Sequence, residues 1–283
     1  MKKLTFIIAG LALMTACTEK VHIDLGKDTE RLVVEGIITN DTMAHTIKLT
    51  TTTEYYYDQP APTVSGAIVI LSDGITTDTL KENTTGSGIY QTRTDYYGVA
   101  GRTYTLNIVL QQPIDGHKEY TSTCEMKQVP AADSIQMEYK KNYYGDLDFW
   151  VLKTYFQEPP EENFYMFQFK KNGVMQTDTI SEYAISDDRF FNSTYLDGVG
   201  IFWLGQDKDF DYYYPVQPGD TITLITAGIT DEYYHFIMDV MLETGMQTPM
   251  FSGPPANVKG NINNGAIGFF AAYTRNEVTT IAR

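Results

Sequence analysis

Three aspartates at alternate positions, Asp207, Asp209 and Asp211, supply hard oxygen ligands of the kind that Ca²⁺ prefers. An EF-hand loop that began at Asp207 would need glycine at its sixth position and glutamate at its twelfth. Tyr212 stands at the sixth position, and Pro218 stands at the twelfth. We therefore expect an acidic, solvated turn, with calcium binding as the alternative.

Other catalytic or metal-binding patterns are missing from the sequence. The four histidines are far apart and form no HExxH or HxH pair: His22, His45, His117 and His235. There is no GxSxG elbow, CxxC pair, GxxxxGK[ST] loop or GxGxxG loop. We expect a non-enzymatic protein without a cofactor. Because paired carboxylates could come from many positions, a surface hydrolase stays open as an alternative.

Clusters of adjacent tyrosines are the most unusual feature of the sequence. Neighbouring side chains on a strand point to opposite faces, so each cluster should place at least one ring outside the core. Exposed tyrosines suit stacking on sugars or peptides and contacts with proteins. The alternative is aromatic coverage of the sheet ends. The candidate ligand or partner contacts lie in two predicted loops and are Tyr55, Tyr56, Tyr57, Tyr212, Tyr213 and Tyr214.

Cys17 ends an N-terminal segment with the features of a secretory signal. A positive start, an apolar run and two small residues precede it, as Lys2-Lys3, Leu4–Met14 and Thr15-Ala16. This ending resembles a bacterial lipobox, in which the cysteine becomes the first mature residue and carries lipid. We expect residues 1–16 to be a lipoprotein signal peptide, Cys17 to anchor the chain to a membrane, and residues 17–30 to be a polar linker. The alternative is an ordinary signal peptide with Cys17 incidental.

Cys124 is the second of the two cysteines. If Cys17 carries lipid, Cys124 has no partner for an intramolecular disulfide. It lies in an alternating segment without a positively charged neighbour, Tyr120–Met126, so we expect a buried strand thiol and not a reactive one.

The charge balance excludes one class of partner. The formal net charge is −15, whereas nucleic-acid binding depends on clusters of Lys and Arg. Hydrophobic residues make up 42% of the chain, enough to build a packed core. Abundant Thr, Tyr, Val, Ile and Phe favour strands.

Residues 31–130 show short strand-like runs separated by turn residues, as expected for an immunoglobulin-like or transthyretin-like β-sandwich. The runs are Leu32–Thr39, Thr46–Thr51, Ala67–Leu71, Thr77–Leu80, Gly88–Thr92, Thr103–Leu110 and Glu119–Met126. Without a Cys…Trp…Cys framework, this is not an antibody-type domain.

Residues 131–283 are expected to form a second β-rich domain with one helix near 230–245. Tyr233, Phe236, Ile237, Val240 and Met241 give this helix one apolar face, and Thr230 can cap its start. Strands are predicted at Ser134–Tyr139, Asp148–Gln157, Asn163–Lys171, Met175–Ile180, Thr221–Thr226, Ala266–Tyr273 and Glu277–Ile281. The stretch from Asp187 to Gly219 is expected to be loops around short strands.

Four stretches occur in order behind Cys17, with the letters LVVEGIIT, VSGAIVIL, GRTYTL and PPANVKGNINNGAIGFFAAY. Together they resemble a family of Bacteroidota lipoproteins classed as domain of unknown function 4249. The resemblance runs from about Arg31 to the C-terminus. It implies an outer-membrane lipoprotein, often encoded beside a TonB-dependent transporter, and it supplies no catalytic residues.

The combined expectation is a mostly β, lipid-anchored outer-membrane protein that faces the cell surface or the periplasm, with surface exposure favoured. It would act as a non-catalytic subunit of a TonB-dependent barrel and help to capture a nutrient such as a glycan, a peptide or a metal complex. The alternatives are an envelope scaffold independent of a transporter and the surface hydrolase named above. Purification with or without a barrel separates the first two.

Overall fold

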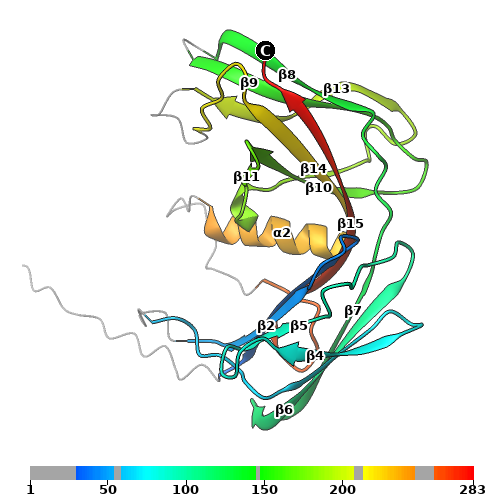
Figure 1. Ribbon diagram of the computed structural model, residues 1–283, viewed down its shortest axis with the longest axis vertical. Helices are drawn as coiled ribbons and strands as arrows, with labels where there is room; N and C mark the ends of the chain where they lie inside the picture. Colours follow the sequence, from blue (N-terminus) through cyan, green and yellow to red (C-terminus); the bar gives the residue numbers. More distant parts are fainter. Residues whose placement is uncertain (1–29, 54–58, 145–146, 207–212, 246–257) are drawn as a thin grey trace, which may run out of the picture.

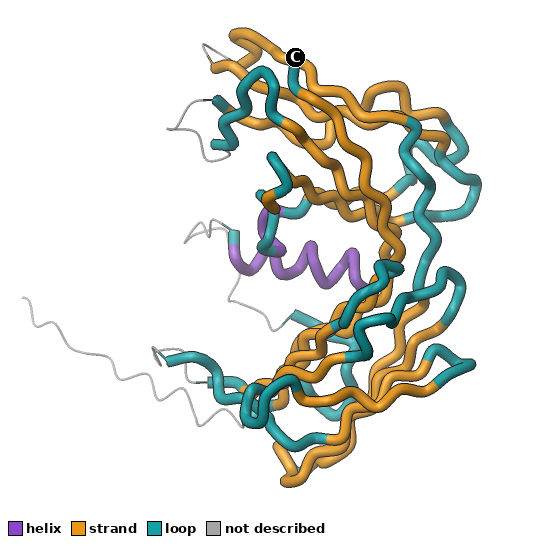
Figure 2. Tube along the Cα trace, in the orientation of Figure 1, coloured by secondary structure: helices purple, strands orange, loops and turns teal. Residues whose placement is uncertain are grey.

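The structure is a computed structural model that describes residues 30–53, 59–144, 147–206, 213–245 and 258–283. It is mostly β, as predicted, with a single α-helix among the described residues. Figure 1 shows a crescent with β2, β4, β5, β6 and β7 at one end, β8, β9 and β13 at the other, and the helix α2 on the inner side. Figure 2 shows how strands surround that helix.

The first part of the chain is a curled sheet around one hydrophobic core. Its strands follow the order β1-β2-β5-β4-β3-β6-β7 and alternate buried with exposed residues, so every second side chain faces the core. The core centres on large, fully buried side chains such as Tyr90, Tyr104 and Leu106. The bounds are β1 Leu32–Thr39, β2 Thr46–Thr51, β3 Ile68–Ser72, β4 Thr77–Glu82, β5 Ile89–Gln91, β6 Thr103–Ile114 and β7 His117–Glu125.

The last strand, β15 (Ile267–Ile281), connects the two ends of the crescent. Its first half pairs in parallel with β1, from Val33↔Ile267 to Thr39↔Tyr273. Its second half pairs antiparallel with β14 (Thr221–Ile229), which belongs to the second part of the chain. After β7, Lys127 also bridges Tyr273, which brings the curled first sheet back to β15.

The second part packs two sheets face to face. One sheet has the order β13-β9-β8, and the other is formed by β11, β10, β14 and β15, with β12 beside β10. Trp150, Leu152 and Phe156 of β9 meet Tyr165, Phe167 and Phe169 of β10 in the core between them. The bounds are β8 Ser134–Tyr144, β9 Leu147–Gln157, β10 Phe164–Lys171, β11 Val174–Met175, β12 Ala184–Asp187 and β13 Tyr195–Gly205.

The helix α2 (Asp231–Thr244) covers the other face of the β10–β14–β15 sheet. Its buried Tyr233 and Ile237 pack against Phe269 and Ala271 of β15. At its start, the Thr230 hydroxyl accepts a hydrogen bond from the backbone N–H of Tyr233 at 3.3 Å, a cap worth about 1 kcal/mol. A short 3₁₀ turn, η2 (Ile180–Glu182), lies against the helix.

Three local predictions were wrong. The strand predicted at Met175–Ile180 does not form: β11 ends at Met175, and the Glu182 side chain accepts the backbone N–H groups of Asp178 and Thr179 before the η2 turn. The stretch 187–219 contains the long strand β13, although loops around short strands were expected there. The two strands predicted at 266–273 and 277–281 are one continuous strand, β15. Among the described residues, no helix is long and apolar enough to cross a membrane.

Candidate functional site

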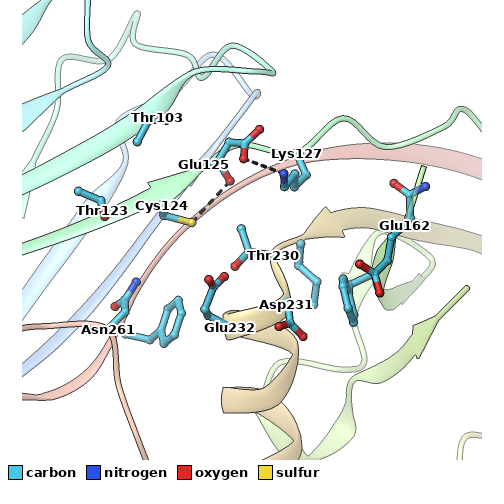
Figure 3. A pocket seen from close by; sticks show the side chains of 14 residues that line it. Thr103, Thr123, Cys124, Glu125, Lys127, Glu162, Thr230, Asp231, Glu232 and Asn261 are labelled. Carbon is cyan, nitrogen blue, oxygen red and sulfur yellow. Dashed lines mark hydrogen bonds and ion pairs between the residues drawn. The ribbon is translucent and has the colours of Figure 1, made fainter. Parts of the chain in front are cut away.

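Two concave sites of ligand size lie among the described residues. An acidic groove of about 570 Å³ lies where β6 and β7 meet the start of α2 and the beginning of β10 (Figure 3). An aromatic cavity of about 640 Å³ lies at the opposite end of the same helix, between the C-terminal end of α2, the η2 turn and β13. Either volume would accept a small organic ligand.

The acidic groove has Cys124 on its floor, and this thiol is not a nucleophile. Cys124 is buried, as predicted, and its sulfur accepts a hydrogen bond from the backbone N–H of Ala272 at 3.2 Å. Burial raises the pKa of the thiol to about 11, so the group stays protonated at neutral pH.

The charged side chains of the groove lie at its exposed rim. Lys127 forms an ion pair with Glu125 at 2.7 Å, and Asp231 contacts Nδ1 of His235 at 2.8 Å (Figure 3 labels the first three of these residues). Glu232 also lines the groove. Among the described lining residues, these exposed carboxylates do not form a nucleophile–base pair.

The aromatic cavity is built from segments far apart in the sequence. Phe202 on β13 and Tyr214 both contact the buried ring of Phe169, with ring centroids 4.9 and 5.3 Å from it. Met241 and Gly245 approach from the end of α2. The lining residues are Thr177, Ser181, Glu182, Tyr183, Ala184, Ile201, Phe202, Trp203, Leu204, Tyr214, Met241, Thr244 and Gly245.

Side-chain hydrogen bonds hold the wall formed by residues 177–184. The backbone N–H of Phe169 donates to Oγ1 of Thr177 at 3.0 Å, and the amide of Gln168 donates to the Thr177 carbonyl at 2.9 Å. Glu182 accepts the backbone N–H groups of Asp178 and Thr179 at 3.1 Å each, closing a capping box over η2. The wall is therefore fixed to the edge of β10.

The charges that border this cavity are negative. Glu182 is the single charged side chain among its described lining residues. The C-terminal end of α2 faces it through Thr244 and Gly245, and the last turn of that helix carries no basic residue. The negative end of the helix dipole is thus not neutralised by the helix itself. Burial raises the pKa of the nearby Tyr183 phenol, so that group stays neutral.

The structure brings one of the predicted tyrosines into this cavity. Tyr214 lines it, and Tyr213 lies next to it in the chain with 44% of its side chain exposed. The other predicted site residues lie outside the described residues: Cys17, Tyr55, Tyr56, Tyr57, Tyr212, Asp207, Asp209 and Asp211. Among the described residues, no group of three or more His, Cys, Asp or Glu side chains could hold a metal ion.

Sequence reasoning missed Phe202 and Tyr183. The run Ile201-Phe202-Trp203-Leu204 has the apolar and aromatic composition of a strand and could have revealed β13. Gly198 and Gly200, which precede it, resemble a turn and hid that signal.

Comparison with known families gives one match. The family model described as a domain of unknown function, DUF4249, matches residues 18–279. The comparison with curated proteins gives no match.

Proposed function

The chain belongs to the family described as a domain of unknown function, DUF4249, and from this premise we propose that it is a lipid-anchored envelope protein that captures a ligand in its aromatic cavity. In this proposal Cys17 carries the lipid, and the body delivers its ligand to a TonB-dependent outer-membrane barrel. The family resemblance supports the barrel as partner, and the lipobox-like ending at Cys17 supports the anchor.

The observation that carries ligand capture is the aromatic cavity itself. Ligand sites are concave and mostly apolar, with a few polar groups that converge on the ligand. The cavity at the end of α2 has this character, since Phe202, Tyr214 and Met241 line it together with Glu182. Its walls are held by the packed ring of Phe169 and by the capping box over η2, so the site is preformed.

A non-catalytic role agrees with the chemistry of both concave sites. The thiol of Cys124 is buried and protonated in the acidic groove. The aromatic cavity has one carboxylate, Glu182, among its described lining residues, whereas a glycosidase uses a pair. Neither arrangement supports the hydrolase alternative.

A second candidate, an envelope scaffold, is favoured by β13. This strand pairs with β9 on one side; on the other, the described residues form a bridge from Tyr213 to Gly205. Its Tyr195, Val199 and Trp203 side chains are exposed. An open edge with exposed aromatic side chains can add a strand from another protein.

Mild extraction from membranes through a C-terminal tag tests the proposal. We expect the wild-type protein to fractionate with membranes and to co-purify with a barrel in near-equal amounts. Cys17→Ala should move the protein to the soluble fraction and remove the barrel from the purified sample. Cys124→Ala is the matched control, because it removes the other cysteine and should change neither result.

Two outcomes would contradict the proposal in different ways. A membrane-bound wild-type protein that purifies without any barrel would overturn the transporter partnership and favour the scaffold. A Cys17→Ala variant that stays in the membrane would overturn the lipid anchor.

A further inference from the structure

We infer that the aromatic cavity binds an organic cation, meaning a ligand with an ammonium group on an apolar body; this inference rests on the proposed ligand capture.

The aromatic wall attracts positive charge. Tyr183, Phe202 and Tyr214 line the cavity, and the last two are packed on Phe169. The face of an aromatic ring attracts an ammonium group by about 0.5 to 2 kcal/mol, with the larger values in desolvated sites. Met241 supplies a polarisable apolar surface for the body of the ligand.

The end of α2 adds negative potential to the same space. The C-terminal end of α2 faces the cavity through Thr244 and Gly245; there the Val240 carbonyl accepts the Thr244 hydroxyl, and the Met241 carbonyl accepts the Gly245 N–H. A basic side chain commonly neutralises such an end, but the last turn of α2 has none. A cation bound in the cavity would neutralise this end of the helix dipole instead of a basic side chain.

The charge of the described lining residues favours a cation over an anion. Glu182 is negative, and no Lys, Arg or His is among the described lining residues. Oε2 of Glu182 accepts two backbone N–H groups, while Oε1 forms no hydrogen bond with a described residue. The chain carries a formal charge of −15, which would also attract cations from solution.

The hydroxyl groups of the lining disfavour a neutral polyol. Ser181 bonds the Thr179 hydroxyl at 3.1 Å, and Thr244 donates to the carbonyl of Val240 at 2.8 Å. Thr177 already accepts the backbone N–H of Phe169. Because part of the hydrogen-bonding capacity of these aliphatic hydroxyls is used within the protein, they recognise the many hydroxyls of a sugar less well, whereas a cation needs mainly rings and carbonyl oxygens.

Titration calorimetry on the full lipidated protein in detergent tests this inference. The probes are choline and 3,3-dimethylbutan-1-ol, which has the same shape without the charge. We expect choline to bind about tenfold more tightly than the alcohol, the ratio that corresponds to one cation–π site. Phe202→Leu should reduce this ratio by removing one ring and keeping the apolar contact.

Glu182→Gln and Glu232→Gln form a matched pair for the charge of the lining. Both remove one negative charge from the chain, but Glu232 lies in the acidic groove at the opposite end of α2. Glu182→Gln keeps an oxygen for the capping box and should weaken choline binding by about threefold. Glu232→Gln should leave the affinity unchanged.

Equal affinities for choline and the alcohol, or no binding of choline, would overturn the cation inference. Equal effects of the two glutamate substitutions would also overturn it, because the charge would then act from a distance. Such calorimetry results would overturn the cation inference alone, because they do not affect whether the barrel co-purifies. Loss of the barrel with choline binding intact would overturn the proposed function alone.

Discussion

At the scale of single residues, Asp73 shows how the fold holds a buried charge. One of its oxygens accepts the backbone N–H groups of Ile75 and Thr76 at 2.9 and 2.6 Å, and the other contacts Arg102 at 2.6 Å. Burial alone would raise the pKa of this carboxyl, but these hydrogen bonds outweigh burial and lower it to about 2. The ionised side chain therefore stabilises the turn between β3 and β4.

Asp73→Asn should lower the free energy of unfolding by about 2 kcal/mol at neutral pH, the equivalent of the pKa shift. Since the folded pKa is depressed, this stability is present above the usual pKa of 3.8 and is lost as the pH falls towards 2. Urea unfolding of wild type and variant should therefore converge in acid. Asp95→Asn, at an exposed carboxylate, is the control, and equal losses in both variants would contradict the account.

Glu158 and Asp188 form a second case, in which two carboxyl groups are buried together. Each side chain is 1% exposed. The Tyr165 hydroxyl donates to Glu158 at 2.8 Å, and the backbone N–H of Asn163 donates to Asp188 at 2.8 Å. Burial raises the pKa of Glu158 above its usual 4.5, and the Asp188 carboxylate adds to this effect against the Tyr165 hydrogen bond. The fold therefore favours the protonated form of Glu158.

The raised pKa of Glu158 predicts that stability falls as the pH rises. The contribution is fully present below the usual pKa and is lost as the pH rises through the folded pKa, because the folded protein must then release the proton. Glu158→Gln resembles the protonated acid, so its free energy of unfolding should depend less on pH above the usual pKa of 4.5. Glu161→Gln, at an exposed glutamate of the same loop, should follow the wild-type curve. Parallel curves for Glu158→Gln and wild type would contradict the raised pKa of Glu158.

At the scale of elements, the parallel contact between β1 and β15 depends on Gly268. This residue has a φ of +94°, and a Cβ there would collide with the backbone carbonyl of Val34 on the neighbouring strand. Only glycine permits both the conformation and the close approach. The parallel pairing of β1 with β15, which connects the two ends of the crescent, therefore requires glycine at position 268.

Gly268→Ala should therefore destabilise the protein by more than the roughly 1 to 3 kcal/mol of backbone strain alone. Gly74→Ala separates the two effects, because Gly74 also has a positive φ of +83° but has open space around its Cα. Thermal unfolding should show the larger loss for Gly268→Ala. Equal losses would mean that the close approach to Val34 contributes nothing.

The same elements show what the sequence could and could not predict. The strands of the first part and the apolar face of α2 could be predicted, because apolar residues repeat at the spacing of a strand or of a helix within each segment. Gly198 has a positive φ of +76°, and register shifts on either side of Val199-Gly200 break the alternation in β13. Residues 274–276 suggested a break in β15, but the backbone N–H of Arg275 donates to the Asn40 side chain at 2.8 Å and the strand continues. A hydrogen bond between residues this far apart in the sequence cannot be predicted from the residues next to either partner.

At the scale of the whole molecule, α2 lies on the inner side of the crescent (Figure 1). The acidic groove lies at the start of this helix and the aromatic cavity at its end. The cavity joins η2, β13, Tyr214 and the last turn of α2, which are separated by tens of residues. The sequence indicated the tyrosine cluster but not its partners, because their meeting depends on how β10 and β13 pack. The proposed ligand site therefore depends on the packing of the whole second part of the chain and not on one motif.

The central claim, ligand capture in the aromatic cavity, is tested most directly by native mass spectrometry of the protein released gently from its own membranes. Ala184→Trp fills the cavity from β12, and Val174→Trp adds the same bulk on exposed β11 as a control. We expect wild type and Val174→Trp to carry a bound small molecule that Ala184→Trp lacks, with the barrel still present in all three samples. The same bound mass on Ala184→Trp as on wild type would contradict the account.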